Sequence, residues 1–216
     1  MAVLDKLEAE LEEQIKLISE EFISRYLPAN PEEGPDVYHQ HVKAFCILAH
    51  AAFEEFVEQV SLALMMNAVD AWYKNRSLNL HLVSLLLFYN ASLQTVDNED
   101  DDQKRNFDQM RVLIDDIKRA HSKAVTDNHG FSLKYLRSIL TPVGIDVSND
   151  PSLSNSLRTL ADARGSYAHT AAEFGMFVDR KKARHPMTPE KARDVVKDCL
   201  TLSKKIAEDA RKLFVT

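Results

Sequence analysis

The sequence contains few of the residues that interrupt helices, with 5 glycines and 7 prolines among 216 residues. Glycine and proline are the residues least compatible with a helix interior, so their scarcity favours an α-helical chain. No stretch of useful length alternates apolar and polar side chains, as a half-buried strand would. Because 45% of the residues are hydrophobic and 28% are charged, the chain has the composition of a globular protein with a substantial core. We therefore expect an all-α fold.

The chain also has few cysteines and no long apolar run. Its two cysteines, Cys46 and Cys199, have neither metal-ligand spacing nor a disulfide-rich context, which is typical of reduced cysteines. No segment reaches the roughly 18 uncharged apolar residues that a membrane span requires. The Met1 end is acidic and amphipathic, unlike a signal peptide. We therefore expect a cytoplasmic protein that does not enter a membrane.

Several motifs that would indicate a cofactor or a metal are missing. There is no glycine-rich phosphate loop, no H-E-x-x-H zinc motif and no G-x-S-x-G nucleophile elbow. The acidic run at residues 97–103 lacks the alternating ligands and the glycine of a calcium loop, and we interpret it as a solvated connection. We expect neither a metal nor a cofactor. The net charge of −6 disfavours broad nucleic-acid binding, so any RNA contact should be made by a small local basic site.

Apolar residues recur with helical spacing along most of the chain, which predicts about seven helices. The expected helices cover residues 3–26, 37–74, 78–93, 107–125, 131–140 and 157–172, and a last helix opens at Thr188 and Pro189 and runs to the C-terminus. Ser154 and Asn155 are candidate caps of the sixth helix. Residues 149–152, Asn-Asp-Pro-Ser, are a helix-start signal before it, with Pro151 suited to a first turn. The breaks at residues 28–35 divide the chain into an N-terminal helix with its linker (1–35) and a helical bundle (36–216). The first helix either docks on the bundle, which we favour, or extends as a dimer arm, so it is expected at the periphery.

An Arg-x4-His pattern occurs three times, as Arg76/His81, Arg164/His169 and Arg180/His185. An arginine that neutralises a phosphate and a histidine that transfers a proton are the groups needed for phosphodiester cleavage without a metal. Because the pattern occurs three times in one chain, only its surroundings can distinguish among the copies.

The surroundings favour the second pair. A helix boundary should separate Arg76 from His81, whereas the third pair lies in a basic run that ends at Pro186. This run is either a solvated loop or a patch that contacts phosphates through Arg180, Lys181, Lys182 and Arg184. Arg164 and His169 share an amphipathic helix. The alternative for this pair is structural, with Arg164 paired to Asp162 or Glu173 on the surface.

The long helix at residues 37–74 carries a polar pair within an apolar segment. His50 and Glu54 are one turn apart on the same face. One interpretation is a core histidine held by a carboxylate, and the other is a polar pair that lines a site.

Three blocks occur in a characteristic order: Leu48-Ala-His-Ala-Ala-Phe-Glu-Glu55, then residues 128–145, and then Leu157-Arg-Thr-Leu-Ala-Asp-Ala-Arg164 leading into His169. Together they resemble the HEPN superfamily and, within it, the RiboL-PSP-HEPN group. The resemblance extends over roughly residues 40–213 and leaves the first helix outside it.

The resemblance implies a helical bundle that pairs about a two-fold axis and binds RNA, as a homodimer. It implies a metal-independent endoribonuclease with Arg164 and His169 as catalytic residues. We expect His50, Glu54, Asn128 and Tyr167 to line the site. Proteins of this kind serve as toxins, phage-defence effectors or RNA-processing factors, in some cases with an antitoxin partner. The alternative is a non-catalytic HEPN module that binds RNA, a nucleotide or a partner protein. Gly165 favours this alternative, because the family often has a polar residue after the motif arginine.

The spacing of the pair also constrains the mechanism. Five residues of a regular helix turn through about 500°, so Arg164 and His169 would point about 140° apart. Either Gly165 loosens the helix, or a second protomer completes the site. In the expected mechanism His169 removes a proton from a ribose 2′-OH and Arg164 stabilises the charge on the phosphate.

Overall fold

The computed structural model describes residues 2–30, 32, 34–91, 102–147, 150–168 and 187–214. These ranges contain no β-strand, which confirms the predicted all-α fold. They form seven α-helices: α1 (Ala2–Phe22), α2 (His39–Asn75), α3 (Leu80–Phe88), α4 (Asp102–Thr126), α5 (Leu133–Leu140), α6 (Pro151–Ala168) and α7 (Pro189–Phe214). Three short 3-10 helices, η1 (Ser24–Tyr26), η2 (Pro35–Val37) and η3 (Thr141–Val143), occupy connections.

Helix α2 is the element around which the others are arranged. Its 37 residues give it a length of about 55 Å. Apolar side chains are buried on several sides of this helix, among them Phe45, Phe53, Leu64 and Trp72. A helix that is apolar nearly all round is stable only inside a bundle, and every other α-helix packs against α2.

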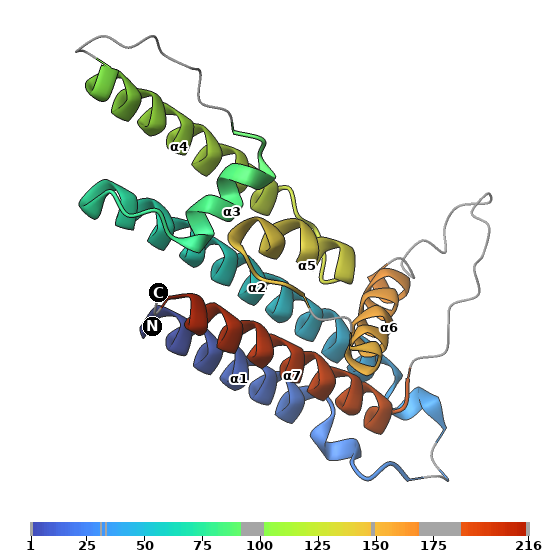
Figure 1. The fold of residues 1–216 in the computed structure, drawn as a ribbon. Coiled ribbons are helices and arrows are strands. Elements are labelled where there is room, and N and C mark those ends of the chain that lie inside the picture. Colours follow the sequence, from blue (N-terminus) through green and yellow to red (C-terminus); the bar gives the residue numbers. More distant parts are fainter. Residues whose placement is uncertain are drawn as a thin grey trace, which may run out of the picture.

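Two groups of helices cover α2. Helices α1 and α7 run beside it along most of its length, and α6 crosses near its N-terminal half (Figure 1). Helices α3 and α4 lie against its C-terminal half, with α5 between the two regions. No helix in the described ranges is long and apolar enough to cross a membrane.

Helix α1 belongs to the same hydrophobic core as the other helices. Leu4, Leu11 and Ile15 are buried against α2 and α7. At the opposite end of the sequence, Arg211 of α7 donates a hydrogen bond from Nε to Asp5 Oδ1 at 2.8 Å and pairs with Glu8. The first helix therefore docks on its own bundle, as we favoured, and its packing is more central than the expected peripheral position.

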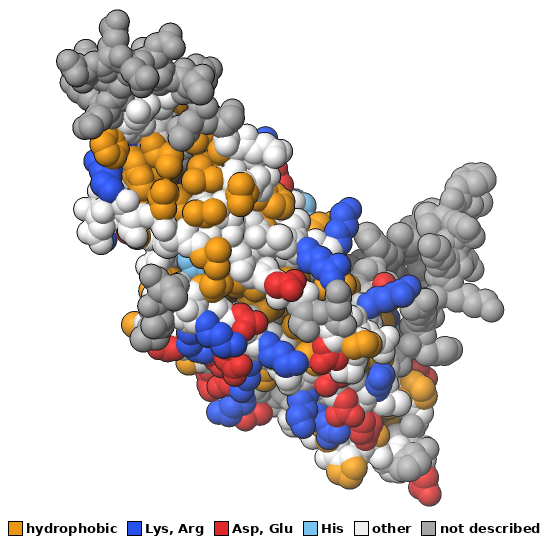
Figure 2. Space-filling model, in the orientation of Figure 1, with side chains coloured by type: hydrophobic (Ala, Val, Ile, Leu, Met, Phe, Trp, Pro, Cys, Tyr) orange, Lys and Arg blue, Asp and Glu red, His pale blue; other side chains and the backbone are white. Residues whose placement is uncertain are grey.

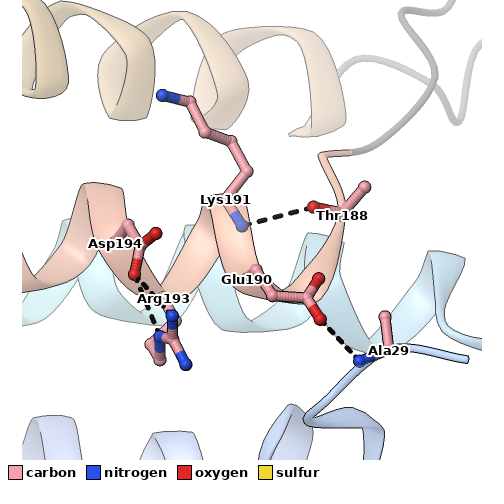
Figure 3. A network of polar contacts seen from close by, with 6 residues as sticks. All are labelled: Ala29, Thr188, Glu190, Lys191, Arg193 and Asp194. Atoms are coloured by element: carbon pink, nitrogen blue, oxygen red, sulfur yellow. Dashed lines mark hydrogen bonds and ion pairs between the residues drawn. The ribbon is translucent and has the colours of Figure 1, made fainter.

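The linker after α1 is tied to the start of α7. The Ala29 backbone N–H donates to Glu190 Oε1, and this bond lowers the pKa of Glu190 (Figure 3). The Lys191 backbone N–H donates to Thr188 Oγ1 at 3.3 Å. This contact confirms that Thr188 caps the last helix.

Some predicted helix boundaries were wrong. Helix α1 was expected to reach residue 26 but ends at Phe22. The chain then turns into η1, and the Ser24 hydroxyl donates to the Ser19 carbonyl in the last turn of α1. Helix α3 is shorter than residues 78–93, because Asn79 caps it by accepting from the Leu82 N–H at 2.9 Å and the chain turns after Phe88.

The start of α6 agrees with the helix-start signal at residues 149–152 and not with the caps expected further along the chain. Asp150 caps it by accepting from the Ser152 N–H at 3.0 Å, so α6 begins at Pro151. The expected caps, Ser154 and Asn155, lie inside the helix.

The ring stack between Phe53 of α2 and Phe131 before α5 supports a prediction about stability. The two rings are 5.1 Å apart and nearly parallel, and both side chains are fully buried. Phe53→Ala should lower the free energy of unfolding by about 3–5 kcal/mol, because it leaves a cavity that the surrounding helices cannot fill. Denaturant unfolding measures this loss. Leu17→Ala, at an exposed position on α1, should change stability by no more than about 0.5 kcal/mol. Equal effects of the two substitutions would contradict the assigned core.

Candidate functional site

One face of α2 carries a row of polar side chains at one-turn spacing: His50, Glu54 and Glu58. His50 is only 3% exposed, whereas Glu54 and Glu58 are partly exposed. We call these three residues the α2 polar row. The loop between α4 and α5 and the C-terminal part of α6 both lie against this region.

His50 holds the loop that precedes α5. Its Nε2 accepts a hydrogen bond from the Phe131 backbone N–H at 3.2 Å, so the proton of the neutral ring is on Nδ1. Nδ1 lies 3.7 Å from Glu54 Oε2, which is too long for a good hydrogen bond. Burial, together with the nearby Arg164 guanidinium, lowers the pKa of His50 to about 4. His50 is therefore a neutral core histidine that positions a loop.

Arg164 lies on the exposed side of α6, close enough to the α2 polar row to act on it electrostatically. It favours the charged form of Glu54, although burial raises the pKa of this carboxyl above its usual value. Among the described residues, no carboxylate lies within ion-pair distance of Arg164. The proposed surface partner Asp162 lies 3.9 Å from Arg158 instead. The other proposed partner, Glu173, lies outside the described ranges. Among the residues that the structure describes, no ion pair occupies the Arg164 guanidinium.

Asn128 and His129 bring the α4–α5 loop to the same place. Asn128 is buried, and its Nδ2 donates to Glu58 Oε1 at 3.3 Å and to the Gly130 carbonyl at 3.4 Å. His129 is exposed and favours the charged forms of Glu54 and Glu58, although burial raises the pKa of both.

Glu58 and His129 are absent from the residues predicted from the sequence. Glu58 continues the His50/Glu54 spacing by one more turn, and His129 lies inside the second block of the family resemblance. Both positions could have been found from these two patterns.

Tyr167 connects the end of α6 to the residue before α7. Its ring is buried, and its hydroxyl accepts from the Met187 backbone N–H at 3.2 Å. Lys43, two turns before His50 on α2, lies 6.0 Å from the centre of the Tyr167 ring. Tyr167 therefore ties the last turn of α6 to the residue before α7, and its ring lies near Lys43, a second cation, on the α2 segment before the polar row.

The remaining predicted residues lie outside the described ranges. These are His169, His185 and the basic residues Arg180, Lys181, Lys182 and Arg184. Their roles, and the distance from Arg164 to His169, stay predictions.

The first Arg-x4-His pair is separated as expected. Arg76 ends α2 and lies over the rings of Trp72 and Phe107, 4.6 and 5.6 Å from their centres. His81 belongs to α3, where it is buried and its Nδ1 bonds to the Val143 carbonyl at 2.6 Å. Both side chains are engaged in packing, so this pair is structural.

Gly165 does not interrupt α6, which is helical from Pro151 to Ala168. A Cβ atom built on Gly165 would meet no neighbouring atom within 4 Å. Of the two alternatives for the Arg164/His169 spacing, a helix loosened at Gly165 therefore has no support in the described part of α6.

A buried Ser61–His121 contact superficially resembles a nucleophile and its base. Ser61 Oγ lies 2.8 Å from His121 Nε2, but its own proton is donated to the Ile139 carbonyl at 2.6 Å. Nε2 must then be the donor to Ser61, and the Tyr89 hydroxyl donates to His121 Nδ1 at 3.1 Å. Because the His121 nitrogen that faces Ser61 already carries a proton, it cannot accept one from the serine. The network instead stabilises the packing of α2, α4 and α5.

The comparisons with known proteins identify the family. The family model described as RiboL-PSP-HEPN matches residues 6–211, so the chain belongs to this family of the HEPN superfamily. The match begins inside α1, so the expected start near residue 40 was too late. Membership marks the chain as a nuclease or RNA-related module. No curated protein and no solved structure matches the chain.

The geometry of Gly165 yields a stability prediction. Gly165→Ala should raise the free energy of unfolding by about 0.5–1 kcal/mol, because alanine loses less backbone entropy in a helix and its Cβ has room. Thermal or denaturant unfolding measures the gain. Destabilisation would mean that the backbone at this position is not helical in solution.

The burial of His50 yields a pH prediction. In the folded chain the pKa of His50 is lowered to about 4, whereas in the unfolded chain the same histidine has its ordinary pKa of 6.5. Stability from this residue is therefore complete above about pH 6.5 and decreases as the pH falls towards 4. Denaturant unfolding should show that the wild type loses free energy of unfolding between pH 7 and pH 4.5. The loss in His50→Gln should be smaller by on the order of 2–3 kcal/mol. His121, whose pKa is also lowered to about 4, contributes equally to both proteins. Identical losses would show that His50 is solvated.

Proposed function

We propose that this protein is a metal-independent endoribonuclease that cleaves RNA by attack of a ribose 2′-OH on the adjacent phosphate. The observation that supports this proposal is the state of Arg164. It is an exposed guanidinium with no carboxylate within ion-pair distance among the described residues, in the block that gives the family resemblance. A planar guanidinium with several donors is suited to bind a phosphate and to stabilise the charge that develops on it.

In the proposed reaction, His169 accepts the proton of the 2′-OH as the oxygen attacks the phosphorus atom. The bond from phosphorus to the 5′-oxygen breaks, and an imidazolium supplies the proton that this leaving oxygen needs. The products are a 2′,3′-cyclic phosphate and a 5′-hydroxyl. Neither step requires a metal or a cofactor, and His50 takes no part because it is neutral, buried and bonded to Phe131.

We further propose that the site is completed by a second protomer of a homodimer. The described part of α6 is regular up to Ala168. If the helical turn continues by one residue, Arg164 and His169 of one chain point about 140° apart and cannot hold the same phosphate. A two-fold axis beside α6 would place the arginine of one chain near the histidine of the other.

The biological role that fits this activity is a toxin or a phage-defence effector in the cytoplasm. A ribonuclease that needs no metal or cofactor acts on any accessible RNA as soon as it is folded, so such a protein needs restraint by an antitoxin or another partner. The two cysteines are buried and unpaired, in keeping with a reducing compartment.

The test is cleavage of RNA in excess chelator by the wild type, Arg164→Ala and His169→Ala. The wild type should cleave, and each substitution should reduce the rate by about 10²- to 10⁴-fold. Arg158→Ala is the matched control, because Arg158 is an exposed arginine of the same helix that pairs with Asp162. It should cleave like the wild type.

Two further results decide the mechanism. A substrate with a single 2′-deoxy nucleotide at the cleaved position should survive, and cleavage of DNA at a similar rate would rule out attack by the 2′-OH. A folded wild type that binds RNA without cleaving it would instead favour the non-catalytic module. Cleavage by all four proteins would place the active site elsewhere.

A further inference from the structure

The loop between α4 and α5 presents an exposed histidine beside α2. His129 is exposed, whereas the residues on either side of it are buried. Two hydrogen bonds to α2 hold this loop on both sides of the histidine. Asn128 Nδ2 donates to Glu58 Oε1 at 3.3 Å, and the Phe131 backbone N–H donates to His50 Nε2 at 3.2 Å. The imidazole is therefore placed next to the α2 polar row by the folded chain itself.

The ring of His129 is available for proton transfer. It is the one exposed histidine within the described ranges, where His50, His81 and His121 are buried. No hydrogen bond or ion pair in those ranges involves its ring. Because histidine changes its charge near neutral pH, an exposed imidazole can hold and release a proton there.

His129 and Arg164 approach the same carboxylate from different elements. Both act electrostatically on Glu54, His129 from the α4–α5 loop and Arg164 from α6. His129 acts on Glu58 as well, one turn further along α2. Helix α6 also packs against α5, which begins shortly after the loop. One chain thus brings a guanidinium and an imidazole to the same surface.

Cations continue from this loop onto the next helix. Lys134 and Arg137 of α5 are exposed. Figure 2 shows Lys and Arg side chains over the region of α5 and α6. An RNA chain that passes Arg164 and His129 would therefore meet further cations for its phosphates on α5.

The proposed cleavage needs two proton transfers on opposite sides of the phosphate. In an in-line displacement, the attacking 2′-oxygen and the leaving 5′-oxygen lie on opposite sides of the phosphorus atom. The group that protonates the leaving oxygen therefore has to come from a different part of the chain than His169, the base that deprotonates the 2′-OH. His129 meets this requirement, because a separate loop carries it.

We propose that His129 is a second catalytic residue, the general acid that protonates the 5′-oxygen as the bond from phosphorus to this oxygen breaks. The inference rests on the proposed ribonuclease function. His129 loses one proton while His169 gains one, and proton exchange with water returns both rings to their starting states. His50 acts only as a positioning residue, since it holds the loop through Phe131.

The test is cleavage, by the full chain in excess chelator, of two RNA substrates that differ in one atom. One has the natural 5′-oxygen at the cleaved position, and the other has sulfur there. A thiol gives up its proton far more readily than an alcohol, so a sulfur leaving group departs without an acid. His129→Ala should slow cleavage of the oxygen substrate by about 10²- to 10⁴-fold and cleave the sulfur substrate at close to the wild-type rate.

Two other variants separate this role from its alternatives. His169→Ala should be slow on both substrates, because the 2′-OH still has to lose its proton. Asp127→Ala is the matched control, at another exposed residue of the same loop, and should cleave both substrates like the wild type. Thermal unfolding should give the same midpoint for the wild type, His129→Ala and His129→Gln, since the ring is exposed.

Three results would overturn the proposal while the ribonuclease activity stands. Equal slowing of both substrates by His129→Ala would mean that His129 binds RNA without donating a proton. An unchanged rate on the oxygen substrate would place His129 outside the site. Failure of both His129 variants to fold would show that the ring is part of the core. A wild type that cleaves neither substrate would instead refute the proposed function, and this inference with it.

Discussion

The burial of α2 is the constraint on which the rest of the structure depends. A helix of about 55 Å that is apolar on most sides cannot be covered by one neighbour. Helices α1 and α7 cover part of it, α6 covers the N-terminal half, and α3, α4 and α5 cover the remainder. The position of each of the other helices therefore follows from the segment of α2 that it covers.

Within this helix, polar residues occur where a neighbouring element supplies a partner. Ser61 meets His121 and the Ile139 carbonyl, and His50 meets the Phe131 N–H. Because an unsatisfied polar group in a core is costly, these bonds fix the neighbours in one register. Glu54 and Glu58 differ, since they lie at the edge of the core, where Asn128, His129 and Arg164 approach. The proposed RNA-binding surface around Arg164 thus lies next to the hydrogen bonds that hold the bundle together.

The fold was largely predictable from the sequence, because helical periodicity in α1, α2, α4 and α7 reflects burial directly. The errors were local. Asp150 rather than Ser154 or Asn155 caps α6, since capping depends on which of several suitable residues the chain turns at. The site was predictable only in part. Spacing identified His50 and Glu54, but the bond from Phe131 to His50, which makes this histidine structural, joins residues 81 positions apart. Such a contact has no local pattern. Arg164 was identified from its motif, whereas the absence of a carboxylate within ion-pair distance, among the described residues, became visible only in three dimensions.

The proximity of the start of α1 and the end of α7 has a practical consequence. The two lie side by side at one corner of the bundle, joined by the pairs of Arg211 with Asp5 and Glu8 (Figure 1). A domain fused to the start of α1 or to the end of α7 would leave the bundle at this corner. Helix α6 lies at the other side of the molecule. A reporter or an affinity handle can therefore be attached at this corner while the surface around Arg164 stays open to large ligands. Because a short peptide could bridge the two ends, the order of the helices could also be permuted without changing their packing.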